Sequence, residues 1–430
     1  MFRVWILAVV LLVQGPAYAR TVADFFNPDV LHRIDLRLDG GDWETLKRNF
    51  QLDDYYRADL IWNGITIRNI AIRSRGLGSR KESKPGLRLD IDRRADGQMF
   101  LGLTSFVLDN LAQDPSGIRE RVAMRFYERM GLPAPREAHA RLFVNNEYAG
   151  LYAIVESIDE RFLTRVFREP DGTIENNGHL FEYEYESVWN FDYLGADLAA
   201  YEPLFDPVTH EDAERTSLYG PIEAMIRAIN ETSDAAFMPT VGQYLDLKLF
   251  MKHVAVQAFI AEWDGVLGYA GVNNFYLYRF ANTTRSQFIA WDDDNAFKAV
   301  DFTLRQSHGE NVLMRRAMQV PELRAAYLDA LLASAAAAMQ EGWLETEVRQ
   351  QRELIADAMR ADTTKPFTND EFEAGMNELA DFARRRAAIV RCEVAKMSAS
   401  GSVTAACGES INAREAAFHA NVIGRHDHRR

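Results

Sequence analysis

The spacing of apolar and polar residues in the first third of the chain predicts paired strands. Residues 58–62 run into Asn63-Gly64, and residues 65–72 then alternate between apolar and polar side chains. Asn-Gly between two such segments is the strongest short-range signal for a hairpin. A glycine loop at residues 75–80 follows, and residues 84–91 alternate again. The pattern therefore places this glycine loop between two strands.

Helical periodicity becomes more frequent toward the C-terminus. Apolar residues recur at helical spacing from Ile118 to Met130, and residues 244–263 form a long apolar segment that predicts a further helix. Additional strands are predicted at 140–144, 150–155, 273–280 and 287–290, and residues from 310 to the mid-390s again favour helix. Because strands concentrate in the first third and helices in the last half, we expect an α+β protein with two lobes.

The expected lobes meet in a segment with little periodicity. We predict a strand-rich N-terminal lobe at residues 20–165, a helical C-terminal lobe at 166–410 and a disordered tail at 411–430. The acidic and aromatic stretch at 171–219 is interpreted as a partly stranded connection on the surface. For residues 192–206 a long solvated loop is an equally good interpretation.

The N-terminus has the three parts of a secretory signal peptide. A basic residue, Arg3, precedes an apolar run from Val4 to Val13, and Ala17-Tyr18-Ala19 gives a small-x-small ending. The run is shorter than the roughly 20 apolar residues that span a bilayer, which favours cleavage after Ala19 over an uncleaved anchor. We therefore expect residues 1–19 to be removed and the protein to be exported, either periplasmic or extracellular. The expected mature chain has no transmembrane segment.

The charge of the chain limits its partners. Forty-nine basic and 63 acidic residues give a net charge of −14. Such an acidic surface opposes non-specific binding to nucleic acid or anionic lipid. It remains compatible with a local basic pocket that receives a phosphate group. No nucleic-acid partner is therefore expected.

The chain has two cysteines, Cys392 and Cys407. Export permits a disulfide between them, and the serines and glycine of the intervening segment make it flexible enough to close. Two unpaired thiols are the alternative. A metal site at these positions is not indicated, because neither cysteine has a histidine or a second cysteine as a close neighbour.

Acidic residues follow two of the predicted elements in the second half of the chain. Asp292, Asp293 and Asp294 come directly after a predicted strand, and Asp292 and Asp294 would lie on the same side of an extended chain. Asp264 ends the long apolar helix, and Asn273-Asn274 follows it. The order Asp, Asn, Asp is that of the groups which orient the acceptor and hold magnesium in protein kinases. A solvated turn at the triplet and a hairpin turn at the asparagines are the structural alternatives.

A second group of residues could bind phosphate. Gly76, Gly78 and Ser79 could bring backbone N–H groups close to phosphate oxygens. Lys84 would supply a cation, and Glu120, near the start of the next predicted helix, could pair with it. An ordinary hairpin turn, a surface lysine and a helix N-terminal acid are the simpler interpretations. Hydrolase and zinc-enzyme functions have no support, since no Gly-x-Ser-x-Gly, His-Glu-x-x-His or Walker motif occurs.

Taken together, these short segments resemble the CotH kinase family. The resembling segments, which cover about residues 30 to 300 in the family's order, include Gly76–Asp90, Ile118-Arg119-Glu120, Gly131–Arg136, Asn145–Tyr152, Val155–Asp159, Trp263-Asp264-Gly265, Asn273–Arg279 and Trp291–Asp294. Each segment is short, and it is their joint occurrence that is specific.

The resemblance implies an atypical, two-lobed, protein-kinase-like fold that binds ATP with Mg²⁺, or with Mn²⁺, between its lobes. The implied activity is phosphorylation of secreted or surface proteins. By position, Asp264 corresponds to the catalytic-loop aspartate, and Asp292 and Asp294 correspond to the metal-binding segment. Lys84 falls in the family's lysine-rich strand entry, but Pro85-Gly86 departs from the usual pattern there, so Arg88 is an alternative phosphate-binding cation.

Two main functions, and a third in which the same site transfers a different nucleotide-derived group, remain open on the sequence alone. The first is an exported kinase that transfers the γ-phosphate of Mg·ATP to an unidentified protein outside the cytoplasm. The second is a catalytically inactive adhesion or coat-type structural protein on the same fold, because a fold does not fix a function. Nucleotide binding in the presence of Mg²⁺ distinguishes them.

Overall fold

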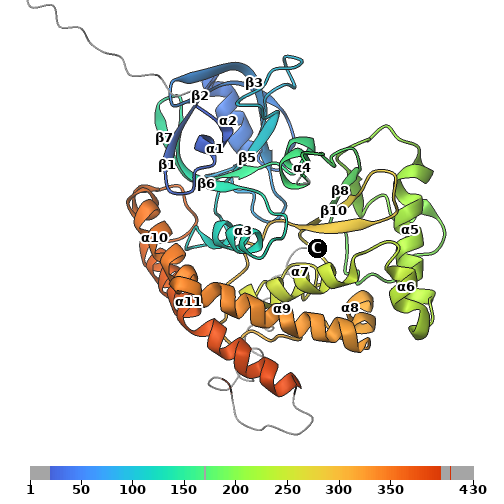
Figure 1. Cartoon of the computed structure of the whole chain (residues 1–430). Coiled ribbons are helices and arrows are strands. Elements are labelled where there is room, and N and C mark those ends of the chain that lie inside the picture. The colour runs from blue at the N-terminus through green and yellow to red at the C-terminus, as the bar shows by residue number, and fades with distance from the viewer. Residues whose placement is uncertain (1–19, 169–170, 399–406, 408–430) are drawn as a thin grey trace, which may run out of the picture.

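The computed structural model describes residues 20–168, 171–398 and 407 of the 430-residue chain. The predicted signal peptide at 1–19 and the predicted tail at 411–430 lie outside the described residues. Within the described part, the chain mixes strands and helices as expected, with most strands before residue 160 and most helices after it (Figure 1). The division into the lobes 20–165 and 166–410 stays a prediction.

Seven strands close into a barrel near the N-terminus. They are β1 (Leu31–Leu38), β2 (Tyr56–Trp62), β3 (Ile65–Arg75), β4 (Gly86–Asp90), β5 (Ser105–Asp109), β6 (Glu137–Val144) and β7 (Glu147–Glu156). Their order is β1-β2-β3-β4-β5-β7-β6, and β6 returns parallel to β1 to close the barrel. The predicted hairpin is confirmed, because Asn63 and Gly64 both take the positive φ angles, 48° and 81°, of a tight β2–β3 turn.

The barrel is filled by apolar side chains. Phe25, from the short helix α1 (Val22–Phe25), meets Trp62, Phe100 and Phe106 edge-on, with ring centroids 4.9 to 5.3 Å apart. All four of these side chains are buried. The helix α2 (Gly40–Arg48) contacts β2 and β3. In β1 and β2, buried residues alternate with more exposed ones, so the alternation visible in the sequence marks the face that points into this core.

A second, four-stranded antiparallel sheet lies beside the helices. Its strands are β8 (His179–Tyr183), β9 (Phe205–Pro207), β10 (Phe275–Arg279) and β11 (Ser286–Ala290), in the order β11-β10-β8-β9. The predicted strands at 273–280 and 287–290 are confirmed as β10 and β11. The segment 171–219, predicted to be partly stranded, contributes β8 and β9 to the same sheet. Between them, the stretch 192–206 includes only one turn of 3₁₀ helix, η1 (Leu198–Ala200), before β9 begins.

The other regular elements of the described chain are helices. They are α3 (Arg119–Arg129), α4 (Glu160–Val166), α5 (Arg215–Glu231), α6 (Phe237–Val241), α7 (Leu247–Ile260), α8 (Val312–Ala317), α9 (Pro321–Met339), α10 (Trp343–Ala361) and α11 (Asn369–Ser398), with short 3₁₀ turns η2 (Asp234–Ala236) and η3 (Gln340–Gly342). α9 packs against α7 and α11, and α10 reaches β7 of the barrel. Figure 1 shows α3 lying between the barrel and the layer of α7, α9 and α11. The long apolar helix predicted at 244–263 is α7, which is three residues shorter at each end.

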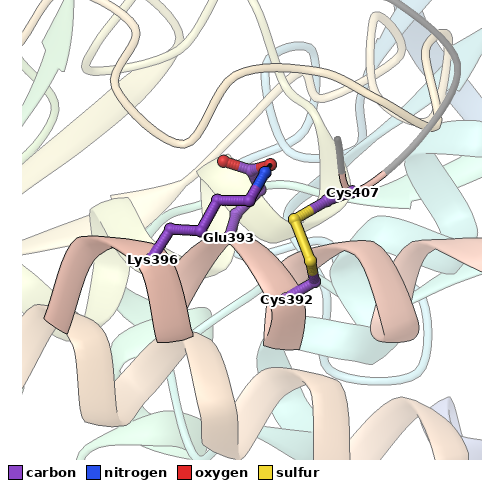
Figure 2. The surroundings of a disulfide bond; sticks show 4 residues. All are labelled: Cys392, Glu393, Lys396 and Cys407. Carbon is purple, nitrogen blue, oxygen red and sulfur yellow. Dashed lines mark hydrogen bonds and ion pairs between the residues drawn. A yellow bond between two sulfur atoms is a disulfide. The ribbon is translucent and has the colours of Figure 1, made fainter. Parts of the chain in front are cut away.

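The predicted disulfide is present. Cys392 on α11 is bonded to Cys407, with their Cα atoms 5.7 Å apart (Figure 2). On the same helix, Glu393 and Lys396 form an ion pair of 3.1 Å. Within the part of the chain that the structure describes, each helix is too short or too polar to span a bilayer.

Candidate functional site

The first acidic segment of the site follows α7. The helix ends at Ala261, whose φ of 58° turns the chain out of the helix, and the buried Arg386 of α11 donates hydrogen bonds to the carbonyls of Ala258 and Phe259. These bonds satisfy carbonyl groups that a helix end leaves unpaired. Asp264 lies just beyond this fixed end. The side chain of Asn273 lies close enough to its carboxylate to lower its pKa, so the structure brings these two predicted residues together.

The second acidic segment follows β11. Asn274 lies beside it, and its side-chain amide donates to the carbonyl of Asp292 at 3.2 Å. Asp292 has a φ of 57°, so the extended geometry expected here is wrong: the strand ends at Ala290 and the chain turns within the triplet. Asp292 and Asp294 are nevertheless half-buried while Asp293 points fully inward.

Asp293 is the most deeply buried member of the triplet. Neither of its carboxylate oxygens has a partner with hydrogen-bond geometry among the described residues, although the Tyr127 hydroxyl is close enough to lower its pKa. Asp294 is better satisfied. It accepts hydrogen bonds from Gln113 at 3.3 Å and from Asn295 at 2.9 Å. A buried carboxylate without partners is costly and requires an explanation.

The proximity of these carboxylates shifts their ionisation. Burial first, and then the Asp292 charge, raise the pKa of Asp264 to about 7, although the nearby side chain of Asn273 opposes the shift. Burial also raises the pKa of Asp292 to about 6, while Arg75 lowers it, and raises that of Asp293 to about 8. The pKa of Asp294 is well above its usual value, through burial and then Asp292. The raised pKa values favour protonated carboxyl groups near neutral pH, and a divalent cation beside them would favour the charged forms instead.

Three more buried acids adjoin the site, and sequence reasoning gave a role to only one of them. Glu262, Glu120 and Glu137 are all less than a tenth exposed. Burial is the largest cause of the high pKa of each. The next charge that raises the pKa is that of Asp293 for Glu262, that of Glu137 for Glu120, and that of Asp109 for Glu137, where Arg121 opposes the shift. Glu262 stands two residues before Asp264, and Glu137 follows the Gly131–Arg136 segment. Both acids were therefore visible in the sequence, but their burial was not.

Lys84 does not pair with Glu120, which corrects the sequence-based expectation. Its ammonium lies 2.7 Å from a carboxylate oxygen of Asp362, and both side chains are fully buried. Asp362 follows α10 and also accepts a hydrogen bond from the backbone N–H of Leu151 at 3.0 Å. The reason is topological: the end of α10 contacts the barrel at β7, whereas Glu120 faces the other acids.

The glycine loop lies beside the second acidic segment. Gly76 has a φ of 103°, and a Cβ there would lie 2.4 Å from the Ser79 hydroxyl, so only glycine fits without displacement. A Cβ on Gly78 would lie 3.2 Å from the side-chain oxygen of Gln113. Since Gln113 also donates to Asp294, the loop and the triplet are neighbours.

Two arginines lie beside this loop. Arg75 lies 3.8 Å from Asp109 and close enough to Asp292 to lower its pKa, and its guanidinium lies 5.5 Å from the Trp291 ring centroid. Arg88, the sequence-based candidate, pairs instead with Asp90 at 2.9 Å. Arg75 was missed, although it directly precedes Gly76.

The sequence profile of the CotH kinase protein family matches residues 72–390, which include both acidic segments and the glycine loop. The chain belongs to this family. Inner spore coat protein H of Bacillus subtilis (strain 168) is 24% identical over 298 residues, which cover 67% of this chain and 77% of that protein. Invasin CotH3 of Rhizopus delemar is 26% identical over 198 residues, which cover 45% of this chain and 31% of the invasin.

Among solved structures, this CotH chain aligns with the Helicobacter pylori proinflammatory kinase CtkA. The alignment covers 76% of this chain and 95% of the other, with 10% identity and a TM-score of 0.31. A score this low carries no conclusion about the fold.

The residues of this CotH chain fit a hard divalent cation by their chemistry. Carboxylate and amide oxygens are the ligands that Mg²⁺ takes in proteins. Asp292, Asp294 and either Asn273 or Asn274 supply such oxygens, and the buried carboxyl of Asp293, whose oxygens have no hydrogen-bond partner among the described residues, lies beside them. In the part of the chain that the structure describes, no three Asp, Glu, His or Cys side chains are already arranged as a metal site.

Proposed function

We propose that this protein is a kinase of the CotH type that transfers the γ-phosphate of Mg·ATP to a protein acceptor. The observation that supports the proposal is that three segments distant in sequence lie side by side: the one after α7, the one after β11 and the glycine loop. Asn273 lies close enough to Asp264 to lower its pKa, Asn274 donates to the carbonyl of Asp292, and Gln113 joins Asp294 to the glycine loop. Phosphoryl transfer needs positioning and charge stabilisation rather than covalent chemistry from the protein, and these segments can supply both.

Each segment then has a distinct role. Asp264, with a pKa of about 7, would orient the acceptor hydroxyl and accept its proton near neutral pH. Asp292 and Asp294, with Asn273 or Asn274, would hold Mg²⁺ or Mn²⁺, which would neutralise charge on the phosphates. The N–H groups of the loop from Gly76 to Ser79 would face phosphate oxygens.

The phosphate-binding cation remains open among three residues. Lys84 is fully buried against Asp362, which makes it a rigid cation, and Arg88 is partly exposed beside Asp90. Arg75 is the one that lies next to Asp292. Variants at each position, tested for nucleotide affinity, would assign the role.

We further propose that the protein acts outside the cytoplasm. The signal-peptide pattern at residues 1–19 supports export, and the relatives are named as a spore coat protein and as invasins. The same names favour a second candidate function, that of a coat-type or adhesion protein without catalysis. The chain spans only about a third of the length of invasin CotH3, so the whole invasin's activity is not carried over.

Calorimetry with Mg·ATP and Mn·ATP, combined with a phosphoryl-transfer assay on a mixed protein acceptor, tests the proposal. Asp294→Ala should abolish metal-dependent nucleotide binding, whereas Asp264→Ala should keep binding and lose transfer. Asp329→Ala, which removes an exposed carboxylate on α9, is the matched control and should change neither. Failure of well-folded wild type to bind nucleotide at millimolar concentration with either metal would refute the kinase proposal and favour the structural one.

A further inference from the structure

A polar groove of about 850 Å³ lies at the end of the small sheet that points away from the acidic segments. β10 begins next to Asn274 and ends at Arg279, and the groove is lined by Arg279 and by the β10–β11 connection from Asn282 to Arg285. Five strand residues at about 3.3 Å each separate the groove from the candidate kinase site by roughly 16 Å. The groove is therefore a separate site.

The lining of the groove is basic and polar. It includes Arg279, Arg285 and His179 together with serine, threonine, asparagine and glutamine side chains, and it contains no aspartate or glutamate. This composition is unusual for a chain with a net charge of −14. A groove of this size lies within the range of small-ligand and peptide-side-chain sites.

The side chain of Arg279 is held in one position in the wall of the groove. It is 5% exposed and donates hydrogen bonds to the carbonyls of Ser217 at 2.7 Å and Leu218 at 3.0 Å. Burial alone lowers its pKa to about 10, so no carboxylate among the described residues lies close enough to oppose the shift. A buried cation without a counter-ion is costly, and an anion in the groove would relieve that cost.

One histidine, His179, lines the wall as a neutral ring, because burial and then the Arg279 charge lower its pKa to about 4. The rings of His179 and His210 lie 4.8 Å apart, and His179 lies near enough to Arg279 to be affected by its charge. The exposed Arg285 and the hydroxyls of Thr283 and Thr284 line the groove beside them. The hydroxyls of Thr283 and Thr284 donate to the carbonyls of Phe280 and Gln243. The exposed guanidinium of Arg285 has no hydrogen-bond or ion-pair partner among the described residues, and Arg279 adds a fixed positive charge behind it. Two guanidinium charges beside one acid-free space match an anion with several acceptor oxygens.

We propose that this groove binds a phosphate monoester, in the form of a phosphorylated side chain on a peptide. The volume exceeds what a free phosphate ion requires, and Phe280 with the amides of Gln243 and Asn282 offers apolar and hydrogen-bonding contacts for the peptide around it. Arg279 would supply the preset charge, and Arg285 would close on the phosphate from the exposed side. The inference does not depend on kinase activity.

Calorimetry without nucleotide or divalent metal tests the site, using a short peptide with a central phosphoserine, its unphosphorylated twin and inorganic phosphate. The phosphopeptide should bind, and Arg285→Gln should weaken it by about tenfold or more, because one charge-assisted hydrogen bond is lost. Arg57→Gln, which removes an exposed arginine from the barrel strand β2, is the matched control and should have no effect. Arg279→Gln should weaken binding further, with circular dichroism as the check on its folding.

Three outcomes would overturn the inference. They are equal binding of the two peptides, equal affinity of inorganic phosphate and the phosphopeptide, or an Arg285→Gln variant that binds like wild type. Asp294→Ala separates this inference from the kinase proposal. It should lose Mg·ATP binding and keep phosphopeptide binding, so either proposal can fail while the other stands.

Discussion

The buried ion pair between Lys84 and Asp362 gives the sharpest test of how the structure is held together around the site. Asp362 has several partners besides Lys84: the N–H groups of Leu151, Thr364 and Lys365 and the hydroxyl of Thr364 all donate to its carboxylate. Lys84 has one carboxylate partner, Asp362, at 2.7 Å. The two halves of the pair are therefore not equivalent.

This asymmetry sets the expected magnitudes. Asp362→Ala leaves a buried ammonium without a counter-ion and the buried Leu151 amide without an acceptor, so we expect the free energy of unfolding to fall by about 3 to 5 kcal/mol. Lys84→Met keeps the apolar stem of the side chain and leaves the carboxylate bonded to its backbone donors. We expect that variant to lose only about 1 to 3 kcal/mol.

Urea denaturation of both variants at pH 7, followed by circular dichroism, measures the difference. Asp357→Ala is the matched control, since this aspartate lies on the same helix, α10, and its side chain is 92% exposed. We expect the control to change the unfolding free energy by less than about 0.5 kcal/mol. Equal losses in the two ion-pair variants, or a larger loss in Lys84→Met, would refute the reasoning.

Two further predictions concern other buried features. Burial lowers the pKa of His253 from 6.5 to about 3 in the folded protein. The unfolded chain binds a proton at this residue below pH 6.5 and the folded protein does not, so wild type loses stability as the pH falls from 6.5 toward 3. His253→Phe lacks this titration and should lose about 2 kcal/mol less stability than wild type between pH 7 and pH 5, measured by urea denaturation. Gly76→Ala should weaken Mg·ATP binding in calorimetry. Gly97→Ala is the control and should bind Mg·ATP like wild type, because a Cβ there would meet nothing within 4 Å. Equal Mg·ATP affinities of Gly76→Ala and wild type would contradict a role for the loop.

Local features of the fold were predictable from the sequence, and long-range pairings were not. Asn63-Gly64 specifies its turn through its own backbone preferences, so the β2–β3 hairpin was visible from a few residues. The joining of β8 to β10 depends on chain segments separated by several helices. No local pattern records such a pairing, so the second sheet could not be assembled from the sequence.

In the candidate site, too, some features were predictable from the sequence and others were not. Asp264, Asn273, Asp292 and Asp294 were selected by residue type and order, and the structure brings them together. The triplet's orientation was not predictable, because the positive φ of Asp292 breaks the strand alternation on which the prediction rested. The partner of Lys84 was missed for another reason, since it comes from the far C-terminal helices.

The position of Arg386 determines when, during synthesis of the chain, the candidate site gains its support. This one side chain bonds to the carbonyls of Ala258 and Phe259, where α7 ends before Asp264, and to those of Val300 and Phe302, shortly after Asp294. Both acidic segments therefore rest on a residue in α11, the last helix of the described part of the chain. Because a ribosome builds the chain from its N-terminus, the support beneath the candidate site is missing until α11 has been synthesised. A fragment that stops before α11 contains all of the proposed site residues but lacks the clamp that holds their two segments side by side.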